Sequence, residues 1–105
     1  MRYKSNKLSN LEKSRYSILT DEMDKCYICS LPYPDINEIF PGRNRINSMR
    51  YGLCIPLCRK CHNQYHKDRD MQLFFMKKAL DEFLKSHTLQ EFKDNFEYIK
   101  GLDIF

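Results

Sequence analysis

The stretch "IPLCRKCHNQYH", Ile55 to His66, decides the fold because it joins half of a metal-binding cysteine pattern to a pair of histidines. The other half of the pattern is "CYIC", Cys26 to Cys29, and 28 residues separate the two halves. Each Cys-x2-Cys turn brings two sulfurs close enough to share one ion. The sequence therefore predicts a tetrahedral zinc site, and its four ligands are Cys26, Cys29, Cys58 and Cys61.

Two disulfides are the alternative for these cysteines, and the rest of the chain favours zinc. The first residues, "MRYKSNKLSNLEKSRYSIL", carry charges throughout and do not resemble a signal peptide, and no apolar run is long enough to span a bilayer. We therefore expect no membrane partner and a reducing, cytoplasmic setting, where paired cysteines bind metal. A chain of 105 residues also gains folding energy from such a staple. The fifth cysteine, Cys54, is expected to be a small buried apolar side chain.

Charge is distributed unevenly along the chain, whose formal net charge is +4. Residues 1–17 carry five basic side chains and one acidic one, and residues 25–70 carry eight basic and four acidic ones. The excess positive charge thus lies in an N-terminal arm and around the cysteines. This distribution permits a polyanionic partner without requiring one. The charge of residues 1–17 by itself favours a solvated, partly mobile arm over a binding surface.

Three segments differ in composition and in the spacing of their apolar residues, and together they predict an α+β protein. Residues 1–25 are expected to form a basic arm with a short helix, residues 26–70 a loop-rich zinc core with short strands, and residues 71–105 a helical extension packed on that core. In the extension, apolar residues spaced three and four apart predict one helix, and "TLQE" from Thr88 predicts a capping box that starts another, ending near Gly101. The aromatic residues among the apolar positions of the two helices are expected to be core. The apolar positions of the two helices are Leu73, Met76, Leu80, Phe83, Leu84, Leu89, Phe92, Phe96 and Ile99.

The histidine pair follows the last cysteine directly. His62 and His66 are spaced i and i+4, which on a helix places both imidazoles on one face, close enough to hold a second ion. Because Cys61 and His62 are adjacent, they point in different directions, and one short helix can border two metal sites. Two alternatives remain: the histidines are simply exposed, or one of them replaces a cysteine at the zinc.

Taken together, "CYIC", "INEIFP" and "IPLCRKCHNQYH" resemble the zinc-containing HNH, or ββα-metal, endonucleases over about residues 26–66. The order of "GRNR", "YGL" and "PLC" is similar to that in compact phage-borne members. The resemblance implies a ββα-metal core, in which two strands and a helix grip one catalytic divalent ion and the four-cysteine zinc ties the hairpin to the helix. It also implies a DNA partner and a phage or mobile-element origin.

The resemblance assigns roles residue by residue. His62 and His66 match the family's ligands of the catalytic metal, and the four cysteines match its zinc ligands. When Ile39, Phe40 and Pro41 are aligned with the family's apolar and proline positions, Asn37 falls at a metal-ligand position and Glu38 at the general-base position. The phage-like members are expected to carry histidine at position 37. Either Asn44 or Asn47 is expected to take the hairpin-bracing role of the family's middle asparagine.

The residue types limit the chemistry that this motif can perform. The amide of Asn37 offers a weak neutral oxygen that suits Mg²⁺ or Mn²⁺, but it has no group that accepts a proton near neutral pH. Glu38 is the candidate base, and its alternative is a salt bridge to Arg43 or Arg45. The expected contacts to DNA phosphates are Arg43, Arg45, Arg50, Arg59 and Lys60.

Two functions follow as hypotheses. The first is a metal-dependent endonuclease that hydrolyses DNA, with structural zinc and a catalytic divalent cation. The second, motivated by Asn37, is a catalytically degenerate HNH-fold zinc protein that binds nucleic acid or a host protein without cleavage. A plain zinc-ribbon binding module ranks last because it leaves His62 and His66 without a purpose.

Overall fold

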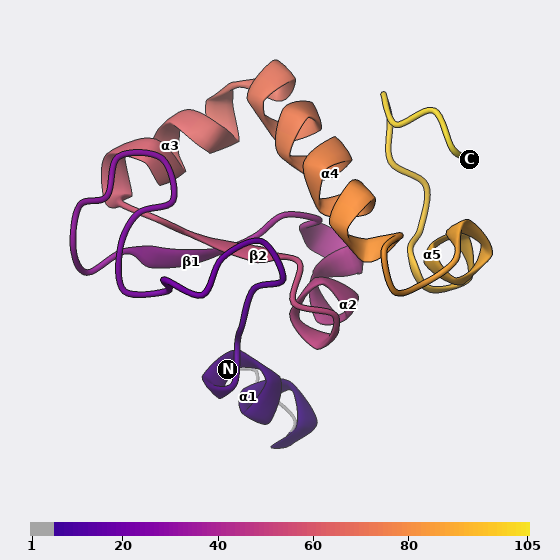
Figure 1. Ribbon diagram of the computed structural model, residues 1–105, viewed down its shortest axis with the longest axis horizontal. Coiled ribbons are helices and arrows are strands. Elements are labelled where there is room, and N and C mark those ends of the chain that lie inside the picture. Colours follow the sequence, from indigo (N-terminus) through magenta and orange to yellow (C-terminus); the bar gives the residue numbers. More distant parts are fainter. Residues whose placement is uncertain (1–5) are drawn as a thin grey trace, which may run out of the picture.

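The computed structural model describes residues 6–105 and has a small α+β fold, as predicted (Figure 1). The part of the basic arm formed by residues 1–5 lies outside the described residues. Two short strands lie in the middle of Figure 1, with α3 and α4 along one side and α1 on the other. The elements are α1 (Asn6–Lys13), β1 (Asp35–Glu38), the 3-10 helix η1 (Gly42–Asn44), α2 (Arg45–Arg50), β2 (Cys54–Leu57), α3 (Arg59–Lys67), α4 (Arg69–Phe83) and α5 (Leu89–Asn95).

Strands β1 and β2 pair antiparallel, with Asp35 opposite Leu57 and Glu38 opposite Cys54. Every residue of β2 is buried, and only Cys58 separates this strand from α3. The side chain of Cys58 forms the N-cap of α3 by accepting a hydrogen bond from the backbone N–H of Cys61. At the other end of the helix, the Tyr65 hydroxyl donates to the Ile39 carbonyl at 3.1 Å. The cap starts α3 directly after β2, and the bond from Tyr65 fixes the other end of the helix against the chain just beyond β1.

One hydrophobic core holds the molecule together. It includes side chains from the first cysteine turn, the two residues after β1, strand β2, α3, α4, α5 and the C-terminal segment. The C-terminal helices are therefore part of the same core as the hairpin. Within the described residues, the largest fully buried side chains of this core are Tyr65, Phe40, Phe83, Phe92, Ile39, Leu53, Ile55 and Leu57.

The second predicted C-terminal helix starts as expected but ends early. Thr88 forms the predicted capping box with Glu91, and α5 follows it. The helix stops at Asn95, six residues before Gly101, so the predicted end was wrong. The reason is tertiary: the side chain of Asn44 accepts from the Glu97 N–H at 2.7 Å and donates to the Glu97 carbonyl at 3.3 Å. This pair of bonds holds the chain extended after α5, and Ile99 is buried outside the helix.

The described part of the N-terminal arm packs on the core. The Tyr16 hydroxyl donates to the Arg50 carbonyl at 2.8 Å, and the Ile18 N–H donates to the Gly52 carbonyl at 2.9 Å. Gly52 has a positive φ of 70°, and a Cβ at this position would collide with the Tyr16 ring. Glycine is thus required here both for the backbone conformation and for the close approach of the arm.

Candidate functional site

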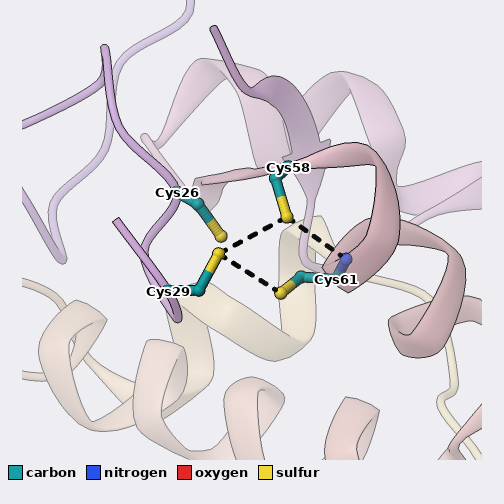
Figure 2. A group of neighbouring side chains, drawn as sticks. All are labelled: Cys26, Cys29, Cys58 and Cys61. Atoms are coloured by element: carbon teal, nitrogen blue, oxygen red, sulfur yellow. Dashed lines mark hydrogen bonds between the residues drawn. The ribbon is translucent and has the colours of Figure 1, made fainter. Parts of the chain in front are cut away.

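The four predicted zinc ligands come together in space (Figure 2). Their sulfurs all lie within 4.8 Å of one another. The Cys29 sulfur is 3.5 Å from that of Cys58 and 3.8 Å from that of Cys61. A tetrahedral zinc with bonds of about 2.3 Å separates its sulfurs by about 3.8 Å, so the donor set fits this metal. Within residues 6–105, no other group of three or more Cys, His, Asp or Glu side chains is close enough to hold an ion.

Backbone hydrogen bonds shape the first cysteine turn, Cys26 to Cys29, and join it to the hairpin. The Cys26 N–H donates to the Leu31 carbonyl at 2.8 Å, and the Tyr27 N–H donates to the Pro56 carbonyl of β2 at 2.7 Å. Ser30, just after the turn, adopts a positive φ of 66°. The chain thus returns sharply and sets Cys26 and Cys29 opposite the N-terminus of α3, where Cys58 and Cys61 lie.

The thiols of the cluster differ in acidity. Burial raises the pKa of Cys26, but hydrogen bonds from the backbone at Cys29 and Cys58 outweigh it and lower that pKa to about 6. The pKa of Cys61 is raised to about 12, by burial first and then by the neighbouring sulfurs. Cys26 therefore becomes a thiolate before Cys61 does, and a bound cation is needed before all four sulfurs lose their protons.

Cys54 lies outside the cluster, as predicted. It is fully buried in β2, and its thiol donates to the Ser48 carbonyl at 3.8 Å. Burial, with a smaller effect from the negative charge of Glu38, raises the pKa of Cys54 to about 12. A thiol that stays protonated is inert, so this residue contributes packing.

The two histidines lie side by side on α3. The ring centroids of His62 and His66 are 4.7 Å apart, with an angle of 39° between the ring planes. His62 is partly buried, whereas His66 is exposed. The pair is thus arranged as the i, i+4 spacing predicted.

Asp35, which the sequence did not single out, contacts this pair. Its Oδ2 lies 3.2 Å from Nδ1 of His62 and 3.1 Å from Nε of Arg59. A carboxylate at Nδ1 holds the proton on that nitrogen and leaves Nε2 as the nitrogen able to bind a metal. Metal-binding histidines characteristically have such a partner. Asp35 therefore orients His62, and Arg59 in turn holds Asp35.

Asn37 occupies the same face of β1 as Asp35, because strand residues two apart share a face. Its side chain is buried, with 3% of the residue exposed, and lies beside the Tyr65 hydroxyl. Burial raises the pKa of Tyr65 to about 12, and the nearby amide of Asn37 works against that rise. Within the described residues, no hydrogen bond of normal geometry satisfies Nδ2 of Asn37. A buried amide nitrogen without a partner is unfavourable, so the site retains unused hydrogen-bonding capacity at this position.

Glu38 is placed differently from what its role as a base requires. β1 remains regular up to Glu38, so this side chain points to the face opposite Asp35 and Asn37. There it forms ion pairs with Arg45 at 3.2 Å and with Arg15 at 3.3 Å. The same two arginines also pair with Glu12. The predicted salt bridge to Arg45 is confirmed, and Glu38 does not join the histidine pair.

No protein-family model, curated protein or solved structure matches this chain. The resemblance to HNH endonucleases therefore rests on the motifs alone and stays a prediction. Within residues 6–105, no helix is both long and apolar enough to cross a membrane.

The five predicted phosphate-binding residues do not form one cluster. Arg59 and Lys60 begin α3 and are exposed on the helix that carries the histidines. Arg45 is engaged with Glu12 and Glu38. The remaining two are exposed elsewhere: Arg43 lies 3.7 Å from Glu97, and Arg50 donates to the side chain of Asn47.

Ser48 takes the bracing role expected of an asparagine. Its hydroxyl accepts from the Phe40 N–H at 3.2 Å and donates to the Phe40 carbonyl at 2.7 Å, which fixes the chain just beyond β1. Ser48 is fully buried. The two predicted residues, Asn44 and Asn47, instead bind the backbone at Glu97 and Asn95. They connect η1 and α2 to the C-terminal segment and do not brace the hairpin.

Proposed function

We propose that the chain is a metal-dependent endonuclease of the HNH type that hydrolyses phosphodiester bonds in DNA. The observation that carries the proposal is the contact between Asp35 and Nδ1 of His62, beside the adjacent ring of His66. It directs one imidazole nitrogen toward a prospective ion and adds a carboxylate that fixes the ring. The four cysteines are assigned a structural zinc, which holds α3 and the hairpin in register.

The side chains around the histidines have distinct roles in this proposal. His62 and His66 are the ligands of a divalent ion such as Mg²⁺ or Mn²⁺, and the buried Asn37 is the candidate for a third, neutral ligand. When bound, that ion supplies charge neutralisation at the phosphate and an acidified water. Arg59 and Lys60, exposed at the start of α3, hold the DNA backbone.

Cleavage of plasmid DNA tests the proposal. The zinc-loaded protein is expected to nick or cut the plasmid when Mg²⁺ or Mn²⁺ is added, and His66→Ala is expected to reduce the rate by about 100-fold or more. His87→Ala is the matched control, because His87 lies between α4 and α5 and stacks on Phe83. Identical rates for the wild type and His66→Ala would refute the proposal.

A second candidate function is a degenerate HNH-fold protein that binds nucleic acid or a host protein without cleavage. It is favoured by the ion pairs that hold Glu38, the residue at the family's base position, on the other face of β1. Asn37→His, measured in the same plasmid assay, separates the two. A large gain of cleavage indicates a degenerate natural site, whereas loss of a cleavage that the wild type performs indicates that Asn37 belongs to a working one.

Replacing Asp35 with asparagine tests the orientation of His62. Asp35→Asn keeps the shape of the side chain but removes the charge that holds the Nδ1 proton. Loss of such a partner weakens metal binding by about 10- to 100-fold, so Mn²⁺ affinity measured by calorimetry is expected to fall by that factor. Zinc content is expected to stay unchanged. The exposed Asp103→Asn serves as control, and equal Mn²⁺ affinity in both variants would contradict the role of Asp35.

A further inference from the structure

A separate pocket of about 300 Å³ lies between η1, α4 and the segment after α5. Its floor consists of three buried apolar side chains, Phe40, Met76 and Ile99, together with the buried side chain of Asn44. Its rim consists of exposed residues, and none of the histidines or cysteines lines it. The rim residues are Pro41, Arg43, Arg69, Glu97, Tyr98 and Lys100.

The rim carries three cations and one acid. Arg69 donates to the Gln72 side chain at 2.9 Å and to the Lys100 carbonyl, which fixes its guanidinium at the edge of the pocket. Arg43 and Glu97 are 3.7 Å apart and mostly exposed, so this pair is weak. The pocket therefore presents a net positive rim over an apolar floor.

Tyr98 adds an aromatic ring to this rim. It is 72% exposed, and among the described residues its only ring contact is an edge-on one with Phe105, at 5.9 Å between centroids. A large exposed aromatic beside arginine and lysine is the combination with which proteins bind unpaired nucleotides, through stacking on the base and charge contacts to the phosphate.

We propose that this pocket binds one unpaired nucleotide of a single-stranded DNA segment. The base lies on the apolar floor against Tyr98, and the phosphate lies between Arg69 and Lys100. The volume is at the lower end for ligand sites, about 300–1,000 Å³, which suits a single nucleotide. The inference rests on the proposed function and deepens it, because it implies DNA substrates with an unpaired segment, such as a flap, branch or overhang.

Binding of a fluorescein-labelled oligothymidylate strand, measured by anisotropy, tests the pocket. The full zinc-loaded chain is used without added Mg²⁺ or Mn²⁺, so cleavage does not interfere. Tyr98→Ala and Lys100→Glu are each expected to weaken binding by at least about five-fold, the lower end for loss of one stacked base. Lys93→Glu is the matched control for charge, since Lys93 is exposed on α5 outside the pocket. Both pocket variants change exposed residues, and unchanged zinc content and thermal midpoint verify their folding.

Competition experiments identify what the pocket recognises. Thymidine monophosphate is expected to displace the labelled strand better than inorganic phosphate or thymidine alone. Equal displacement by inorganic phosphate, or by an acidic peptide of the same charge, would overturn the nucleotide assignment. So would binding by Tyr98→Ala within two-fold of the wild type, about 0.4 kcal/mol.

The experiments can refute the nucleotide pocket and the endonuclease activity independently of each other. His66→Ala is expected to bind the strand as the wild type does, because His66 does not line the pocket. Strand binding that depends on Tyr98 in a protein unable to cut DNA supports the pocket and refutes the endonuclease. DNA cleavage with strand binding indifferent to both Tyr98 and Lys100 refutes the pocket alone.

Discussion

Cys58→Ser is expected to unfold the protein, the largest effect of any single substitution considered. Cys58 is buried, follows β2 directly, caps α3 and contributes one of the four sulfurs. Structural zinc in small domains contributes about 10–16 kcal/mol of apparent binding free energy. Total folding stability is only about 5–15 kcal/mol, so loss of the metal removes most or all of it. Circular dichroism and the dispersion of amide resonances are expected to report an unfolded chain.

Cys54→Ala is the matched control, because Cys54 is equally buried but lies outside the cluster. It is expected to retain one equivalent of zinc and to lose only about 1 kcal/mol of stability. Chelation of zinc from the wild type is expected to reproduce the unfolding of Cys58→Ser. A Cys58→Ser protein that folds without metal, or a chelated wild type that stays folded, would show that zinc does not hold the fold.

Acid is expected to act in the same direction as the chelator. The pKa of Cys26 in the folded, metal-free site is about 6, below the ordinary value of 9.0. A depressed pKa gives stability that is complete above the ordinary value and declines as the pH falls through the folded one. Protons also compete with zinc for all four thiolates. Chelation is therefore expected to unfold the protein more readily below pH 6 than at pH 8 or 9.

Local patterns in the sequence predicted the parts of the fold that depend on local geometry. The four cysteines could be placed because each Cys-x2-Cys turn determines its own shape, and the capping box of Thr88 needs only residues 88–91. The end of α5 could not be predicted, because it depends on hydrogen bonds between the Asn44 side chain and the backbone of Glu97. These two residues are 53 positions apart in the chain. Neither propensity nor periodicity contains that information.

In the candidate site, too, local spacing predicted some positions, and contacts between distant segments determine the others. His62 and His66 share one helix, and their spacing alone placed them together. Asp35 reaches His62 only through the pairing of β1 with β2, which the sequence does not specify directly. Glu38 was placed in the site by its motif position, but strand alternation points it toward Arg15 and Arg45. Arg15 belongs to the arm, whose charge by itself favours a solvated segment, so its contact with Glu38 could not be anticipated.

Phe92→Ala is expected to give the second largest loss of stability. Phe92 is fully buried on α5. Its ring stacks on Phe96 at 4.2 Å between centroids and meets the rings of Phe40 and Phe83 edge-on at 5.3 and 5.5 Å. Truncation of a buried phenylalanine costs about 3–5 kcal/mol, because contacts are lost and a cavity remains. In a domain of this size the thermal midpoint is expected to fall by about 4–8 °C per kcal/mol.

Phe105→Ala is the matched control, because Phe105 is 42% exposed and its ring lies 6.3 Å from that of Phe92. A change of less than about 1 kcal/mol is expected there, and equal losses in the two variants would contradict the assignment of Phe92 to the core.

The effect of Phe92→Ala is also expected to reach the nucleotide pocket and the histidine pair, through Phe40. Phe40 forms part of the pocket floor and follows Ile39, whose carbonyl receives the hydrogen bond from Tyr65 on the helix of the histidines. Strand binding is therefore expected to weaken in Phe92→Ala even at temperatures where the protein remains folded.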